Sequence, residues 1–254
     1  MHLKGFENLA RHVPELNSQG GRLKIALYAL GVFTLTTIYF ILTDQIPTWT
    51  LDSQIVVMAL GFLLLSRFFT QKKKIIETHG DAAYRYAFGR FNIPGLALIF
   101  AAIAHTAYMN GPKFTQPAIL NVFTWLGWFN VFIGAVLWLR SVATFGVDNL
   151  TMLYVYFPAE SRMINSSIYK TLRHPIYGAA IYLCFGLALL NAGIYPLTFI
   201  LFLPLGLFGW VRLVEEKELL ERIPEYAEYR KKVPAFFPYP NHILDFFKFL
   251  FTGK

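Results

Sequence analysis

Charged side chains and cysteines are scarce in this sequence. Of its 254 residues only 15% are charged and 56% are hydrophobic, whereas soluble domains carry about 25% charged residues. This deficit largely excludes an ordinary soluble enzyme and a disordered chain. The single cysteine, Cys184, can form no internal disulfide and cannot supply a multi-cysteine metal site, so we expect no bound metal.

Three motifs of soluble enzymes are also absent from the sequence. There is no G-x-G-x-x-G following a strand, no phosphate-binding G-x-x-x-x-G-K and no H-E-x-x-H. Soluble dinucleotide-binding, nucleotide-binding and zinc-protease folds therefore have no support.

The apolar residues are grouped in long uncharged runs, at 25–43, 53–66, 91–112, 114–139 and 175–211. A helix needs about 20 residues to cross a bilayer. The second run reaches that length as 51–69 if Asp52 and Arg67 lie at the two interfaces. The last run is long enough for two helices, near 176–190 and 194–211, with a turn at Asn191-Ala192-Gly193 between them. The sequence therefore predicts an all-α integral membrane protein of about six transmembrane helices, with a C-terminal helical hairpin and a C-terminal tail.

The basic residues identify the two sides of this bundle. With six spans, 22 of the 23 Lys and Arg residues fall on one side, and only Lys113 falls on the other. Because cytoplasmic loops are enriched in Lys and Arg, we expect both termini in the cytoplasm. The polar N-terminus does not resemble a signal peptide, and 241–251 is predicted to be an interfacial helix. The net charge of +8 thus reflects membrane orientation, and the expected partner is the lipid bilayer, with no nucleic acid.

Polar side chains gather at both ends of the predicted hairpin. Arg173 and His174 precede it, and Glu215 and Glu216 follow it. Since two antiparallel helices return the chain to the same membrane face, these four side chains should lie together. Separately, each pair has an ordinary explanation: a basic anchor before a helix that begins with Pro175, and a solvated helix face.

The order of these motifs resembles the integral-membrane methyltransferases, namely the isoprenylcysteine carboxyl methyltransferase and phospholipid N-methyltransferase families. The matching features are Tyr169, the stretch R-H-P-I-Y-G at 173–178, the hairpin, an Arg ahead of the paired glutamates, and Y-A-E-Y-R-K-K-V-P at 226–234. The resemblance is specific over 161–240, weak over 125–160 and absent from the first hundred residues. We therefore divide the chain into N-terminal membrane helices at 1–112 and a methyltransferase-like core with a cofactor-binding tail at 113–254.

This resemblance implies transfer of a methyl group from S-adenosylmethionine to a lipophilic carboxylate, amine or thiol at the membrane interface. Arg and His suit the carboxylate of the donor, glutamates suit its ammonium or ribose hydroxyls, and tyrosine rings suit its adenine or sulfonium. An amine or thiol acceptor would also need a general base. The candidate cofactor-binding residues are Tyr169, Arg173, His174, Tyr177, Arg212, Glu215, Glu216, Tyr226 and Tyr229, and the candidate catalytic residues are His174, Glu216 and Arg230.

Two alternatives remain open at the level of sequence. An NADPH-dependent membrane reductase of the sterol type would share part of this pattern, although its Asn after the Pro and its acidic residue after the Gly are replaced here by Ile176 and Ala179. A non-catalytic membrane protein is the other alternative. Within the methyltransferase interpretation, Ser161 and Ser167 stand where the family commonly has His and Gly, which leaves the acceptor open. We expect His105, in the third span, to be hydrogen-bonded between helices.

Overall fold

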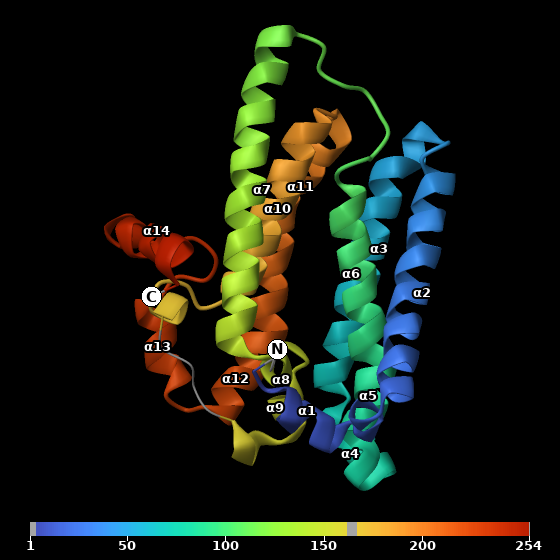
Figure 1. Ribbon diagram of the computed structural model, residues 1–254, viewed down its shortest axis with the longest axis vertical. Coiled ribbons are helices and arrows are strands. Elements are labelled where there is room, and N and C mark those ends of the chain that lie inside the picture. The colour runs from blue at the N-terminus through green and yellow to red at the C-terminus, as the bar shows by residue number, and fades with distance from the viewer. Residues whose placement is uncertain (1–3, 162–166, 254) are drawn as a thin grey trace.

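The computed structural model describes residues 4–161 and 167–253, and in these ranges the chain is helical with no β-strand (Figure 1). Six helices form the bundle: α2 (Gln19–Thr43), α3 (Pro47–Thr70), α6 (Ile93–His105), α7 (Pro117–Phe145), α10 (Pro175–Asn191) and α11 (Ile194–Trp210). Five helical segments of the described chain are long and apolar enough to cross a membrane, and α10 is a shorter apolar helix. The predicted all-α membrane fold is therefore confirmed.

The third segment differs from its predicted bounds. It runs continuously from Lys72 to His105, through α4 (Lys72–His79), α5 (Ala83–Ala87) and a π-helical turn (Phe88–Asn92) into α6. The stretch between the predicted second and third spans is thus largely helical. Charged residues show where a helix leaves the membrane, but a helix can continue beyond that point. The helix ends at His105, before the end of the uncharged run at residue 112, because the chain approaches Gly111 and Pro112, which do not favour a helix.

The connection from α6 to α7 pairs with the turn of the hairpin. The backbone amide of Phe114 donates to the carbonyl of Ala192 at 2.9 Å, and that of Ile194 donates to the carbonyl of Pro112 at 2.8 Å. His105 lies at the same end of the bundle, where its ring contacts Gln54 Oε1 at 2.8 Å and Asp44 at 3.2 Å. The prediction of a histidine that is hydrogen-bonded between helices is confirmed.

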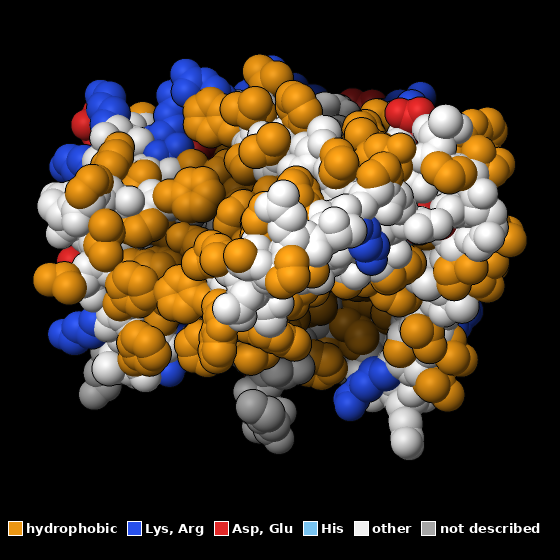
Figure 2. Space-filling model, turned by 90° about the horizontal axis from the view of Figure 1, so that it is seen from above, with side chains coloured by type: hydrophobic (Ala, Val, Ile, Leu, Met, Phe, Trp, Pro, Cys, Tyr) orange, Lys and Arg blue, Asp and Glu red, His pale blue; other side chains and the backbone are white. Residues whose placement is uncertain are grey.

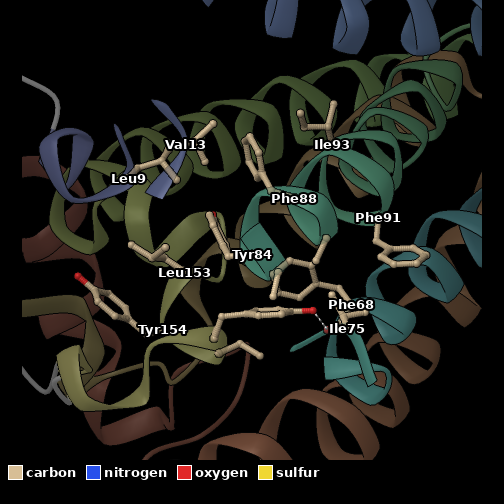
Figure 3. Packing of buried hydrophobic residues seen from close by; sticks show 14 of the residues in the cluster. Leu9, Val13, Phe68, Ile75, Tyr84, Phe88, Phe91, Ile93, Leu153 and Tyr154 are labelled. Atoms are coloured by element: carbon tan, nitrogen blue, oxygen red, sulfur yellow. Dashed lines mark hydrogen bonds between the residues drawn. The ribbon is translucent and has the colours of Figure 1, made fainter. Parts of the chain in front are cut away.

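At the opposite end of the bundle, short helices form a compact layer. This layer contains α1 (Phe6–His12), α8 (Val147–Leu150), α9 (Leu153–Tyr156), α12 (Glu216–Arg222) and α13 (Tyr226–Lys232). Figure 3 shows its core, in which Leu9 and Val13 of the N-terminal segment approach Tyr84 and Leu153. The N-terminal segment is thus packed against the region that follows α7, and Figure 1 places both at the same end as α12.

The outer surface of the bundle is apolar. In the most apolar stretch of α2 only 11% of the residues are buried, and Leu35 and Leu42 are among the exposed side chains of this helix. Figure 2, which looks down on one end of the bundle, shows hydrophobic side chains over much of that end, with Lys and Arg mainly toward the rim. The C-terminal helix α14 (Ile243–Thr252) lies across the bundle beside α7 (Figure 1). Arg162 and Lys254, which entered the charge argument, lie outside the described residues.

Candidate functional site

The hairpin of α10 and α11 brings its two polar ends together. Pro175 occupies the first turn of α10, where its missing amide costs no hydrogen bond, and His174 is the residue just before it. On the return, α11 passes through a π-helical turn (Val211–Glu215) into α12. Such turns insert one extra residue and shift the helical phase, and they are frequent at functional sites. As a result both Glu215 and Glu216 face the start of α10.

Glu216 is the centre of the resulting polar cluster. Its side chain is only 2% exposed. Oε1 accepts from Arg173 Nε at 2.9 Å, lies 3.2 Å from His174 Nε2 and accepts from the Tyr226 hydroxyl at 3.1 Å, while Oε2 lies 3.5 Å from Arg230 Nη1. A buried carboxylate needs this number of donors, because an unpaired charge in the interior is strongly destabilising.

Arg173 fastens the C-terminal tail to the hairpin. Besides its ion pair with Glu216, its Nη1 donates to the carbonyls of Arg230, at 3.1 Å, and Val233. The backbone amides of Arg173 and His174 donate to the carbonyls of Pro234 and Ala235 at 2.9 and 3.0 Å. The guanidinium is therefore engaged on several sides by the protein itself, and its main effect is to hold the tail against α10.

His174 lies between the two glutamates. Its Nδ1 is 3.4 Å from Glu215 Oε1 and its Nε2 is 3.2 Å from Glu216 Oε1. Burial opposes a charged ring, but the hydrogen bonds and negative charges of Glu215 and Glu216 outweigh it and raise the pKa of His174 above its ordinary value. The ring therefore favours the imidazolium form, which can donate to a carboxylate on each side.

Four tyrosines surround this cluster. Tyr177 donates to Glu215 Oε2 at 2.6 Å, and the rings of Tyr226 and Tyr229 lie 5.6 Å apart. Tyr229 donates to the backbone carbonyl of Tyr169, whose own hydroxyl is buried with no hydrogen-bond partner among the described residues. Burial raises the pKa of Tyr169 and of Tyr229, so both phenols remain protonated donors.

A cavity of about 500 Å³ opens beside the cluster. Its polar end, in the layer of short helices, is lined by Tyr169, Arg173, His174, Tyr177, Glu215, Tyr226 and Tyr229 of the predicted residues. Its other end extends between the bundle helices, where the lining is apolar and includes Phe62, Phe100 and Leu203. The volume falls within the range of small-molecule sites, about 300–1,000 Å³.

Three predicted site residues are not among the described residues that line this cavity. Glu216 and Arg230 lie behind its wall, where they pair with each other. Arg212 is exposed, because the π-helical turn that directs the glutamates inward places this residue on the outer side. Glu216 and Arg230 are therefore placed to hold other groups in position, while Glu215 presents its carboxylate to the cavity.

The sequence did not identify five polar residues that line the cavity. They are Asn149, Thr151, Tyr154, Glu218 and Arg222. Glu218 and Arg222 form an ion pair at 2.9 Å with i, i+4 spacing, a signal that was visible in the sequence. Arg222 also donates to Ser161, so one of the two departures from the family pattern lies at the edge of this site.

These features together define a class of protein: an all-α membrane bundle with a buried ionic cluster and a cavity that joins a polar end to an apolar one. Residues 122–226 match the family model described as phospholipid methyltransferase. This segment, which extends from α7 to the start of α13, is similar to that methyltransferase family, and the resemblance drawn from its motifs is confirmed. No curated protein and no solved structure matches the chain significantly. The match favours membrane-bound methyl transfer over the reductase alternative.

Proposed function

We propose that the protein transfers a methyl group from S-adenosylmethionine to a lipophilic acceptor at the membrane interface. The observation that carries this proposal is the single cavity in which a polar end and an apolar end are continuous. A polar, charged donor and an apolar acceptor require two such environments side by side. The family match covers the predicted residues of the polar end except Tyr229.

The polar end fits the chemistry of the proposed donor. Glu215 offers a carboxylate to an ammonium or to ribose hydroxyls, and Tyr169 offers a buried hydroxyl that lacks a partner. The rings of Tyr226 and Tyr229 offer aromatic faces to a cation or to adenine. Because Arg173 is already engaged by Glu216 and the tail, we assign it to holding the site together instead of to the donor carboxylate.

S-adenosylmethionine would supply an electrophilic methyl group on its sulfonium. The chain's own contribution is then to align the acceptor with that group and to exclude water. An anionic acceptor needs no base. An amine or a thiol needs a base, and neither His174, which favours its protonated form, nor Glu216, which is not among the described residues that line the cavity, suits that role.

Calorimetric titration of the purified full-length chain in lipid nanodiscs tests the donor assignment. Saturable binding of S-adenosylmethionine is expected, and Glu215→Gln should weaken it tenfold or more. Glu221→Gln is the matched control, because Glu221 is an exposed residue of the same helix, α12. A folded wild-type chain that binds NADPH but not S-adenosylmethionine would refute the proposal and support the reductase.

A further inference from the structure

One side of the apolar end of the cavity is formed by α3 and α6, which lie outside the matched segment. On α3 its lining residues are Met58, Phe62, Leu65 and Phe69, and on α6 they are Leu96, Ile99, Phe100 and Ile103. Both sets recur at intervals of three and four residues, so each forms a stripe along one helix face. All eight side chains are uncharged, and they lie opposite the wall contributed by α10 and α11.

The cavity runs along the axis of the bundle. Phe69 and Leu96 lie at the ends of α3 and α6 nearest the layer of short helices, and Met58 and Ile103 lie toward the other ends of the same helices. Eleven residues separate Met58 from Phe69, which corresponds to about 16 Å at 1.5 Å per residue. The apolar part is therefore an elongated channel of about half the hydrocarbon thickness of a bilayer, about 30 Å.

The two helices of this wall, α3 and α6, are closely packed at two points. The two helices meet at a pair of glycines, since a Cβ built on Gly61 would lie 3.0 Å from the carbonyl oxygen of Gly95, and the reverse distance is also 3.0 Å. Close backbone contact of this kind is typical of tightly associated membrane helices. Farther along, Gln54 of α3 donates to the carbonyl of Ala102 of α6 at 2.9 Å. These contacts hold the two lining stripes at a fixed distance from each other.

The channel borders the lipid-facing surface between α6 and α7. Phe100 of α6 lines the channel and is also 43% exposed. Its ring meets Trp138 of α7 edge to face, with centroids 6.3 Å apart, and Trp138 lines the channel as well. In contrast, α2 contributes no residue to the lining among the described residues and packs on the outside of α3 and α6 (Figure 1).

From this geometry we infer that α3 and α6 form the subsite for the methyl acceptor. This subsite selects an acceptor that has a nucleophile at one end, attached to one uncharged apolar chain or to a compact apolar body. This inference rests on the proposed function. The lining residues form one stripe on α3 and one on α6, which together define one channel for one apolar chain. The nucleophile lies at the polar end beside Glu215, and Ile103 marks the far end of the channel.

Methyl transfer to a series of acceptors of different length tests this inference. The probes are straight-chain thiols, amines and carboxylic acids of 8 to 16 carbons, with a two-chain phosphatidylethanolamine as comparison and tritium-labelled S-adenosylmethionine as donor. Wild-type enzyme should methylate single-chain probes of one nucleophile class and leave the two-chain lipid unmodified. Ile103→Trp, which fills the far end, should raise KM for the longest accepted probe at least tenfold and leave the shortest unchanged.

Two further variants keep the test decisive. Ile103→Ala should shift the preference toward longer probes, which covers the case in which the tryptophan variant does not fold. Leu35→Trp, on the exposed face of α2, should leave the whole profile unchanged. Two results would show that the inference about α3 and α6 is wrong, provided that the donor binds and the probes are methylated. In the first, neither substitution at residue 103 alters the dependence on chain length. In the second, the two-chain lipid is the preferred acceptor. If the wild-type chain binds no donor, the proposed function itself fails.

Discussion

Removing the Glu216 carboxylate should destabilise the protein more than removing any other acidic side chain of α12. In Glu216→Ala, the guanidinium of Arg173 loses its ion pair while only 9% of its side chain is exposed. His174 and Tyr226 each lose a hydrogen-bonding partner at the same time. Breaking one partner out of a buried ion pair costs about 3–5 kcal/mol, because the remaining charge is left uncompensated.

The expected loss is large enough to measure by thermal unfolding. At about 2–4 °C per kcal/mol for a chain of this size, it corresponds to a decrease in Tm of roughly 6–20 °C. Glu216→Gln keeps the volume of the side chain and should show a smaller decrease of about 1.5–3 kcal/mol, the usual contribution of hydrogen bonds to charged groups. Glu221→Ala, an exposed position on the same helix, should remain within about 0.5 kcal/mol of wild type.

The assay is a fluorescence melt of each variant in the same detergent, at the same protein concentration and heating rate. If Glu216→Ala melts with Glu221→Ala, the buried cluster contributes nothing to stability and the reasoning from its geometry is refuted. A decrease confined to Glu216 would support the role of this carboxylate in joining α10, α12 and the tail.

Three further predictions concern pH, the layer of short helices and topology. Because the pKa of His174 is raised in the folded state, protonation of this ring stabilises the fold fully below the ordinary pKa of about 6.5, and the stabilisation is lost as the pH rises through the folded pKa. The Tm difference between wild type and His174→Gln should therefore shrink from pH 6 to pH 9. A Tm difference that stays constant over this range would contradict the prediction. Asp148 is 5% exposed and accepts hydrogen bonds from Asn8 at 3.2 Å and from Tyr154. Asp148→Asn should therefore accelerate hydrogen exchange of the backbone amides in 147–156. Unchanged exchange would show that this carboxylate does not hold the segment in place. With cytoplasmic termini, an impermeant maleimide should label Lys113→Cys in intact cells and Lys24→Cys only after lysis, in a cysteine-free background; the opposite pattern would invert the topology.

The sequence predicted the bundle because hydropathy and charge report directly on the membrane. It also predicted that the ends of the hairpin meet, because antiparallel helices leave the chain no other arrangement. The bundle follows from the composition of each segment by itself, and the meeting of the hairpin ends follows from the short turn that connects two neighbouring helices. Arg212 shows where this reasoning stops, since a regular helix would bring it near the glutamates and the π-helical turn leaves it exposed.

The roles of α3 and α6 depend on contacts between distant parts of the chain. Nothing in the residues from Met58 to Phe69 distinguishes a channel wall from a lipid-facing surface, because both are apolar. Only the packing of α3 against α6, fixed by Gly61 and Gly95, shows which stripe faces inward. The family motifs gave no help either, since the match begins at residue 122.

Glu215 and Glu216 are neighbours in sequence, but their substitution should have different effects, because only Glu215 lines the cavity. Glu216 is saturated by protein donors, so its removal should lower stability and donor affinity together, because the tail that carries Tyr226 and Tyr229 loses its attachment. Glu215 lines the cavity and is 19% exposed, so Glu215→Gln should lower donor affinity with a smaller loss of stability. Measuring Tm and the Kd for S-adenosylmethionine on both variants distinguishes the two roles. If both variants lose affinity without losing stability, Glu216 contacts the donor directly, and the cluster must open when the donor binds.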